Sequence, residues 1–169
     1  MKCLRSFALG ILFASSAAAQ TPAPRPEDVT TLDGIIRAFY EVVSGPAGQP
    51  RQWGRDSTLY IPRVQFVAMS LENGKPVAAV MDHAAFARRY EGAFVDRGFF
   101  ERETKRVTKR FGNIAHVFSA YEYRATENGP VQGRGVNSIQ LFWDGARWWI
   151  ASATWDDERP DNPIPAELR

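Results

Sequence analysis

The last third of the chain constrains the fold most strongly, because short turn sequences separate runs of apolar and β-branched residues there. Residues 134–141 read RGVNSIQL, and residues 148–155 read WWIASATW after Asp144-Gly145. An Asp-Gly pair between two such runs is typical of a two-residue hairpin turn, since both central positions need a positive φ. Gly112-Asn113 and Asn128-Gly129 interrupt the preceding segments in the same way. We therefore predict an antiparallel meander of four strands, over residues 99–111, 114–126, 131–143 and 147–157.

The part of the chain before the meander predicts helices and a first hairpin. Apolar residues recur every three or four positions in residues 31–43, and residues 52–59 can form a shorter helix. Asn73-Gly74 predicts a hairpin turn. Asp82 is a good N-cap for a further helix that ends near Gly98.

These elements predict one α+β domain over residues 31–157, in which a curved, mostly antiparallel sheet packs against two to three helices. Residues 158–169 contain three prolines, so we expect them to leave the sheet and run extended along the surface.

Residues 1–19 differ in composition from the rest of the chain. Lys2 and Arg5 precede an apolar run, and the segment ends in three alanines at Ala19. This order is typical of a secretory signal peptide, and the apolar run is too short for a permanent transmembrane helix. We expect cleavage after Ala19, a secreted, periplasmic protein without a stable membrane anchor, and an extended, proline-rich leader over residues 20–30.

Composition argues against several classes of function. The predicted signal peptide holds two of the 21 basic residues and none of the 19 acidic ones, so the mature chain has no net charge and nucleic-acid binding is not supported. The single cysteine, Cys3, lies in the same segment, which excludes disulfides and cysteine catalysis in the mature chain. The sequence has no G-x-S-x-G, HExxH or glycine-rich phosphate-loop motif. Hydrolase and nucleotide-binding functions therefore lack their usual support.

The turns also predict which residues share the inner face of the meander. If all three are two-residue loops, Val107 lies opposite Phe118, Phe118 opposite Ile139, and Ile139 opposite Ile150. The result is a funnel closed by apolar residues, with Trp148 in its wall, that opens to polar walls. The same parity places these polar residues on the inner face: Glu103, Lys105, His116, Glu122, Asn137, Ser152 and Thr154.

Three of these residues are candidates for catalysis. Glu103 would face Glu122, and two carboxylates in a dry site cannot both ionise easily, so one could act as an acid or base near neutral pH. The alternative is a solvated pair bridged by Lys105. His116 could carry a proton or donate to a ligand, or it could be a packed histidine with no chemical role.

Other inner residues are candidates for ligand binding. Asn137 could fix a carbonyl or hydroxyl of a ligand, or it could simply pair with Ser152. Thr154 and Trp148 would complete the pocket wall. The two histidines and scattered acids form no recognisable metal-binding pattern, so we predict neither a metal nor a cofactor.

The predicted outer face of the sheet carries Trp149, Trp155 and Phe142, and is too apolar to be fully solvated. We predict that it forms a homodimer interface or is covered by the C-terminal tail. The charged run at residues 101–110, ERETKRVTKR, is typical of an edge strand that resists unwanted strand pairing, although an anion-binding surface is an alternative.

The order of elements resembles the nuclear-transport-factor-2-like superfamily, which includes SnoaL-like cyclases and ketosteroid isomerases. The resemblance rests on the helix LDGIIRAFYEVV, the strands IAHVFSAYEYR and RGVNSIQLF, and the hairpin DGARWWIASATW. It implies a cone-shaped α+β barrel with an internal cavity, often in a dimer formed through the outer sheet surface. Tyr40 lies on the first helix, where isomerase-like members place a tyrosine donor. No matching pair of acids accompanies it, so the isomerase activity is not transferred.

Three hypotheses for function follow. The first is a secreted protein that binds a small apolar ligand through a few polar anchors in its internal pocket. The second is a cofactor-free isomerase, dehydratase or cyclase that uses Glu103, Glu122 or His116 for proton transfer. The third is a structural or partner-binding module that uses the outer sheet face.

Overall fold

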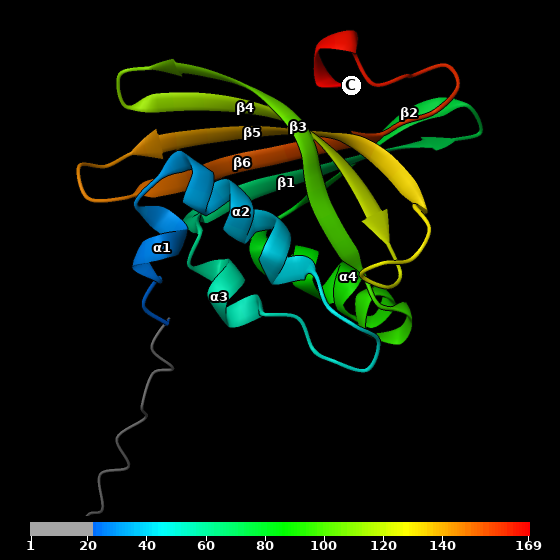
Figure 1. The fold of residues 1–169 in the computed structure, drawn as a ribbon, viewed down its shortest axis with the longest axis horizontal. Helices are drawn as coiled ribbons and strands as arrows, with labels where there is room; N and C mark the ends of the chain where they lie inside the picture. The colour runs from blue at the N-terminus through cyan, green and yellow to red at the C-terminus, as the bar shows by residue number, and fades with distance from the viewer. Residues whose placement is uncertain (1–21) are drawn as a thin grey trace, which may run out of the picture.

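The computed structural model describes residues 22–169, so the predicted signal peptide lies outside the described residues. A curved six-stranded sheet dominates the fold (Figure 1), as predicted for an α+β domain. The elements follow in the order α1 (Pro26–Val29), α2 (Leu32–Val43), α3 (Trp53–Ser57), β1 (Tyr60–Glu72), β2 (Lys75–Met81), α4 (His83–Arg97), β3 (Phe100–Phe111), β4 (Ile114–Arg124), β5 (Gly133–Trp143), β6 (Trp148–Asp157) and a 3-10 turn (Ala166–Leu168).

The strands are arranged in the order β2-β1-β6-β5-β4-β3, which makes β3 and β2 the two edges. All neighbours are antiparallel except β1 and β6. Helices α2, α3 and α4 lie on one side of the sheet, and the C-terminal tail lies on the other (Figure 1). The inner face of the sheet is hereafter the face that the helices cover.

Both long helices begin as the sequence predicts. The Thr31 side chain accepts a hydrogen bond from Gly34 N at the start of α2, and Asp82 caps α4 by accepting from Ala85 N at 2.7 Å. Such caps satisfy backbone N–H groups that lack partners within the helix. The apolar stripe of α2 is buried against the sheet, and its residue Ile35 is fully inaccessible.

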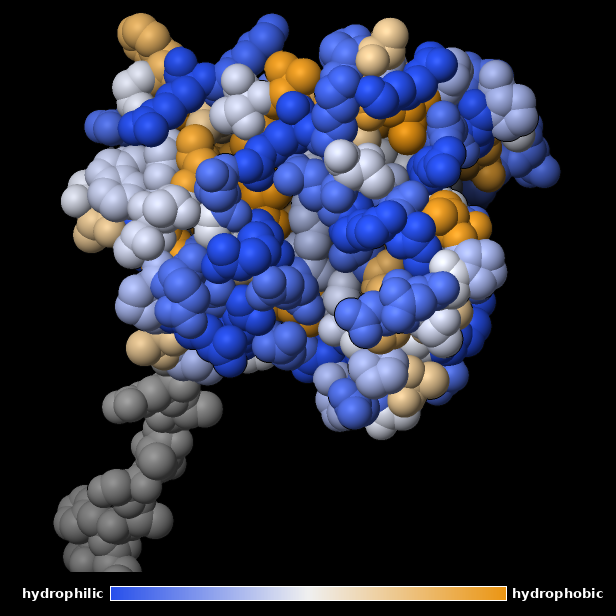
Figure 2. Space-filling view, in the orientation of Figure 1, coloured by the Kyte–Doolittle hydropathy of each residue, from blue (hydrophilic) through white to orange (hydrophobic). Residues whose placement is uncertain are grey.

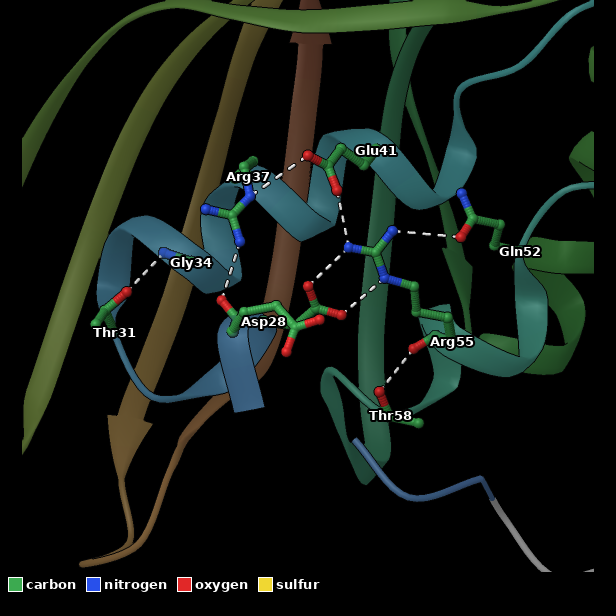
Figure 3. A network of polar contacts seen from close by, with 9 residues as sticks. Asp28, Thr31, Gly34, Arg37, Glu41, Gln52, Arg55 and Thr58 are labelled. Atoms are coloured by element: carbon green, nitrogen blue, oxygen red, sulfur yellow. Dashed lines mark hydrogen bonds and ion pairs between the residues drawn. The ribbon is translucent and has the colours of Figure 1, made fainter. Parts of the chain in front are cut away.

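The prediction of an extended leader over residues 20–30 is wrong at its C-terminal end, because residues 26–29 form α1. Asp28 is fully buried there and accepts two hydrogen bonds from the Arg55 guanidinium, both at 2.7 Å. Arg55 also pairs with Glu41 at 2.8 Å, so a single arginine of α3 joins α1 to α2 (Figure 3). The Arg55 hydrogen bonds lower the pKa of Asp28 despite its burial. This paired carboxylate supplies the local stability that a proline-rich segment lacks by itself.

Two of the predicted hairpins have the predicted register. Asn73 and Gly74 both adopt positive φ angles, 52° and 75°, between the paired residues Glu72 and Lys75. The β3–β4 turn likewise pairs Phe111 with Ile114, and Val107 lies opposite Phe118.

The other two connections of the meander are longer than predicted, which shifts the register. The last β4–β5 pair is Tyr123 with Gly133, and residues 125–132 connect the two strands, so Val117 rather than Phe118 lies opposite Ile139. The β5–β6 turn leaves four residues between Trp143 and Trp148, so Leu141 rather than Ile139 pairs with Ile150.

Two irregularities change the side-chain parity within strands. The β3–β4 register shifts between Glu103 and Lys105, and the β5–β6 register shifts between Gln140 and Leu141. An extra residue in one strand turns every later side chain to the opposite face. These bulges place several residues on faces opposite to those predicted.

The outer face is partly covered by the C-terminal tail. Ile164 and Leu168 are buried in a small apolar cluster with Ala120, and Phe118 and Val136 pack against it. The tail therefore provides one of the two predicted covers for this face. Phe111 is 84% exposed at the tip of the β3–β4 hairpin, so it does not help to close the predicted funnel.

The surface is mostly polar. Hydrophilic residues dominate the face seen in Figure 2, where apolar residues appear mainly in recesses between them. None of the helices within residues 22–169 has the length and apolar character needed to cross a bilayer.

Candidate ligand-binding site

A cavity of about 510 Å³ lies between the inner face of the sheet and helices α2 and α4. A cavity of this size can hold a drug-sized molecule. Its walls are largely aromatic, with contributions from Phe39, Tyr60, Phe66, Phe86, Tyr90, Phe94, Phe99, Tyr121, Tyr123 and Trp155.

The aromatic wall is held together by ring contacts between elements. Phe86 of α4 stacks on Phe66 of β1, with 4.6 Å between ring centroids, and meets Trp155 of β6 edge-on at 5.9 Å. Phe94 stacks on Phe99 at 4.1 Å beyond the end of α4. Because such pairs add to the energy of simple burial, they position α4 over the sheet and hold the cavity wall in place.

Two glycines of β5 create space at one end of the sheet. A Cβ atom at Gly133 would collide with the ring and hydroxyl of Tyr123, and one at Gly135 would collide with those of Tyr121. The two tyrosines therefore lie across β5 where a side chain would normally stand. Because Gly133 and Gly135 have no side chains, the two tyrosine rings form a flat aromatic floor to the cavity.

Tyr121 extends across Gly135 to reach the next strand. Its hydroxyl donates a hydrogen bond to Asp157 Oδ1 at 2.6 Å. Burial and the Asp157 charge raise the pKa of Tyr121, so this hydroxyl stays protonated. Asp157 itself is exposed, and it therefore places an acceptor at the mouth of the cavity.

Glu101 of β3 is the acidic residue inside the cavity wall. It is half-buried, and its carboxylate forms no hydrogen bond or ion pair with any residue in the described part of the chain. Burial, together with the negative charge of Asp157, raises its pKa to about 8. At neutral pH this carboxyl therefore holds a proton that it can give or share.

A buried chain of hydrogen bonds joins the cavity to a second hollow, between α2 and β3. Ser119 Oγ lies 2.6 Å from Glu103 Oε1 and 2.7 Å from the Tyr40 hydroxyl, and Asn137 Nδ2 lies 3.2 Å from the same hydroxyl. Asn137 lines the cavity, whereas Tyr40 and Glu103 line the second hollow. Ser119, Tyr40 and Asn137 are 0%, 5% and 3% exposed.

The direction of each hydrogen bond in this chain follows from the carboxylate at its end. An ionised Glu103 only accepts, so Ser119 uses its single hydrogen on Glu103, and Tyr40 must donate to Ser119. The Tyr40 oxygen then accepts from the amide nitrogen of Asn137. This order of donors and acceptors orients the Asn137 amide so that its acceptor atom, Oδ1, faces the cavity.

Comparison with solved structures identifies the fold. An NTF-2 like protein of unknown function from Silicibacter pomeroyi DSS-3 matches with a TM-score of 0.50 and 14% identity, over 75% of this chain and 92% of that one. The chain has the NTF-2-like fold.

Two further structures agree with this fold. A proposed ketosteroid isomerase from Parabacteroides distasonis ATCC 8503 matches with a TM-score of 0.52 and 14% identity, over 79% of this chain and 98% of that one. A protein of unknown function with a cystatin-like fold from Nostoc punctiforme PCC 73102 matches with a TM-score of 0.57 and 8% identity, over 80% of this chain and 98% of that one. The sequence matches no protein-family model and no curated protein. Identities this low establish the NTF-2-like fold alone.

Three of the predicted site residues come together on the inner side of the NTF-2-like sheet. These are Tyr40, Glu103 and Asn137, which form the hydrogen-bonded chain with Ser119. Asn137 does not face Ser152, because it lies opposite Ser119 and Trp155 in the neighbouring strands.

The predicted pair of glutamates does not form. Glu103 lies opposite Tyr121 and Glu122 lies opposite Arg102, because of the bulge in β3. Glu122 is on the outer face, where it pairs with Arg102 and Arg124 at 2.6 Å each. Burial alone would raise the pKa of Glu122, but the hydrogen bonds from the two arginines outweigh burial and lower it. Glu122 is thus a paired structural carboxylate.

His116 also lies on the outer face rather than on the predicted inner face. It neighbours Val117, whose side chain is buried in the main core on the other side, and its Nε2 lies 3.0 Å from Ser138 Oγ. The one-residue shift between β4 and β5 accounts for the difference. This position separates His116 from the cavity.

The remaining predicted pocket residues do not line the cavity. Ser152 and Thr154 pair with Gln140 and Ser138 on the outer face, after the β5–β6 bulge has turned Trp155 inward. Trp148 is inner and buried, but it packs in the main core against Trp143, with 5.9 Å between ring centroids.

Sequence reasoning missed the cavity's own acids, Glu101 and Asp157, and the tyrosine floor. Glu101 falls within the charged run that is typical of an edge strand, and Asp157 is the last residue of the last predicted strand. The spacing of Gly133 and Gly135 opposite two tyrosines was the available signal, because alternate glycines in a strand often mark a close approach.

A separate polar group lies beside the cavity. Asp56 is fully buried and is bonded to the Tyr60 hydroxyl and to His83 Nε2, both at 2.8 Å. This group ties α3, β1 and the start of α4 together. Within residues 22–169, no group of three or more histidine, cysteine or acidic side chains is arranged to hold a metal ion.

Proposed function

We propose that this protein binds a small, largely apolar molecule in the aromatic cavity, with a few polar groups fixing its orientation. The observation that carries the proposal is the combination of ten aromatic side chains with polar groups that the surrounding residues leave free. An aromatic cavity supplies affinity through burial, and a small number of polar groups supplies orientation.

A cavity-filling substitution tests this proposal. Ala93 of α4 lines the cavity, whereas Ala84 is exposed on the same helix and does not line it. Binding of the neutral apolar dye N-phenyl-1-naphthylamine should be saturable for the wild-type protein, and Ala93→Phe should weaken it about tenfold or more. Ala84→Phe should bind the dye like the wild type.

Two results would contradict the proposal. One is the absence of saturable dye binding by the wild-type protein. The other is an equal loss of binding in Ala93→Phe and Ala84→Phe, which would locate the dye outside the cavity.

A second candidate function is cofactor-free proton transfer at Glu101. The observation in its favour is the half-buried carboxyl whose pKa lies at about 8, since an acid or base works best when its pKa is close to the ambient pH. A carbon-13 NMR titration of the glutamate carboxyls, with Glu101→Gln used for assignment, measures this pKa. A value near the ordinary 4.5 would remove the rationale.

We further propose that the protein acts outside the cytoplasm, on the basis of the sequence of residues 1–19. N-terminal sequencing of the protein recovered from a periplasmic fraction should begin at Gln20. A recovered chain that still begins at Met1 would contradict the proposal.

The homodimer predicted through the outer sheet face is likewise a proposal. The sedimentation of the full chain should be compared with that of a chain ending at Asp157, which lacks the tail on that face. A full-length chain that remains monomeric at all accessible concentrations would contradict the proposed dimer.

A further inference from the structure

The buried polar residues that line the cavity are Asn137, Tyr60 and Tyr121, and both tyrosine hydroxyls already donate to carboxylates. Asn137 is 97% removed from solvent, and its Oδ1 receives no hydrogen bond from any residue in the described range. Among residues 22–169, the fully enclosed side-chain atoms that lack a partner are Nε of Arg51 and Nε of Arg159. The free Oδ1 of Asn137 therefore opens onto space, and Asn137 lines the cavity.

The acidic groups of the same cavity add to this acceptor surface. The carboxyl of Glu101 has no protein partner within the described chain, and Asp157 accepts from Tyr121 through one oxygen only. The Tyr121 hydroxyl is already used as a donor to Asp157. The acceptors that the cavity offers to a bound molecule are thus an amide oxygen and two carboxyl groups, which together favour a donor. A protonated Glu101 still accepts through its carbonyl oxygen, and the other polar lining residues, Ser70, Tyr90, Tyr123 and Gln132, can both donate and accept.

The basic residues of the cavity do not neutralise these acids. Arg89 and Arg97 of α4 line it, but both are exposed and neither lies within 4.0 Å of a carboxylate oxygen in the described structure. The Arg89 guanidinium instead lies over the Tyr90 ring, 5.8 Å from its centroid. The two arginines therefore stand at the rim, and the interior is left without a positive charge.

The aromatic walls favour a positive charge as well. The face of an aromatic ring carries negative potential and attracts an organic cation, most strongly where water is excluded. Tyr121 and Tyr123 present flat rings beside Asn137 and Glu101, which line the same cavity. A cation is thus matched both by the acceptors and by the rings.

We propose that the molecule bound in the cavity is an organic ammonium: an apolar body that ends in a protonated primary or secondary amine. This proposal rests on the proposed binding function and specifies its ligand class. The ammonium donates to Asn137 Oδ1 and to the carboxyl groups of Glu101 and Asp157, and the apolar body lies among the phenylalanine rings of α4 and β1.

Three probes of nearly equal shape test the proposal: 3-phenylpropylamine, 3-phenylpropan-1-ol and butylbenzene. They share one apolar body and end in a charged donor, a neutral donor and a methyl group. Isothermal titration calorimetry at pH 7 should give the tightest binding for the amine, by about tenfold over the alcohol, which corresponds to about 1.4 kcal/mol. Butylbenzene should bind more weakly still, because it leaves Asn137 Oδ1 unpaired.

Variants locate the ammonium. Asn137→Leu and Asp157→Asn should each weaken binding of the amine severalfold and leave butylbenzene unchanged or tighter. Asp96→Asn is the matched control, because Asp96 is an exposed acid of α4 that does not line the cavity. It should leave the preference for the amine intact. Thermal melting of each variant separates loss of binding from loss of folding.

The outcomes distinguish this proposal from the proposed function. If the alcohol or butylbenzene binds the wild type as tightly as the amine, the ammonium is overturned and a neutral apolar ligand remains. If none of the three probes and no apolar dye binds, both proposals fail. The wild-type comparison decides the ligand class even if a variant does not fold.

Discussion

The polar side chains on the two faces of the sheet differ in whether other protein groups pair with them. On the outer face, Glu122 is paired with two arginines, His116 with Ser138, and Asp156 with Arg159 at 2.6 Å. On the inner face, the Glu101 carboxyl and the amide oxygen of Asn137 have no hydrogen-bond partner among residues 22–169, although Asn137 is almost completely buried.

This difference distinguishes polar groups that stabilise the fold from polar groups that are free to bind a ligand. The free Oδ1 of Asn137 opens onto the cavity, so water or a ligand has to satisfy it there. The outer-face groups Glu122, His116 and Asp156 need no ligand, because other residues of the described chain pair with them, although Arg159 Nε is enclosed without a hydrogen bond. The comparison predicts that outer substitutions change the free energy of unfolding, whereas inner substitutions change pH dependence and binding.

The largest expected effect is on the outer face, at the tail. Leu168 is 2% exposed and packs into the cluster under the tail, so Leu168→Ala should lower the free energy of unfolding by about 2–3 kcal/mol. Urea denaturation measures this change, and binding of the amine probe should not change. Glu167→Ala, in the same turn, is the control, with an expected change of less than about 0.5 kcal/mol. Equal effects of the two substitutions would show that the tail does not stabilise this face.

The next largest effect is expected at Glu122. Glu122→Gln removes the charge that holds two arginines together, and should cost about 2 kcal/mol of unfolding free energy without affecting amine binding. Glu127→Gln, in the β4–β5 loop, serves as the control. An unchanged urea midpoint for Glu122→Gln would mean that the outer-face ion pairs contribute no stability.

Glu101 should show the opposite behaviour. Its pKa rises from 4.5 to about 8 on folding, so between these values the folded chain holds a proton that the unfolded chain has lost. Stability should therefore fall as the pH rises from about 4.5 to 8, with a slope of at most about 1.4 kcal/mol per pH unit, and level off above that range. Glu101→Gln should remove this part of the slope.

The measurement is the difference between the wild-type and variant unfolding free energies over pH 4 to 9. Asp96→Asn provides the comparison for an exposed acid. Parallel curves for wild type and Glu101→Gln would contradict the raised pKa and, with it, the contrast between the two faces.

The smallest effect is expected at Glu103, which acts on the cavity from outside. Glu103→Gln gives Ser119 a partner that can also donate, so the Asn137 amide is no longer fixed in one orientation. Amine affinity should fall about twofold to fourfold, with a change in unfolding free energy below about 1 kcal/mol. Loss of stability without loss of affinity would assign Glu103 a purely structural role.

The sequence was sufficient to predict the elements of the fold but not the faces of every strand. Asn73-Gly74 and Gly112-Asn113 have the geometry of two-residue turns, and the registers predicted from them next to the turns are correct. Asn128-Gly129 lies inside a longer loop, where Gln132 N bonds to Tyr123 O at 2.9 Å. A turn dipeptide indicates that the chain reverses, but not how many flanking residues join the loop.

Of the candidate site, the sequence predicts the positions of Tyr40 and Asn137 correctly. Tyr40 is placed by the periodicity of α2, and Asn137 keeps its inner position because β5 has the predicted parity. The β6 bulge has no distinctive sequence signal, so the prediction places Ser152 and Thr154 on the wrong face. The longer β4–β5 loop shifts the register of β4 by one residue, so the prediction places Glu122 on the wrong face as well. The pairing of Ser119 with Tyr40 joins residues 79 positions apart, which no local pattern reveals.

The aromatic floor formed by Tyr121 and Tyr123 also limits the length of the molecule that the cavity can hold. An added methyl group at Gly133 or Gly135 would displace the adjacent tyrosine ring into the cavity and reduce the space between the sheet and α4. The two glycines, whose side chains are single hydrogen atoms, therefore set the depth of the cavity. Substitutions at these two glycines would therefore change the length of molecule that fits, and would also move the tyrosine rings that face its charged end.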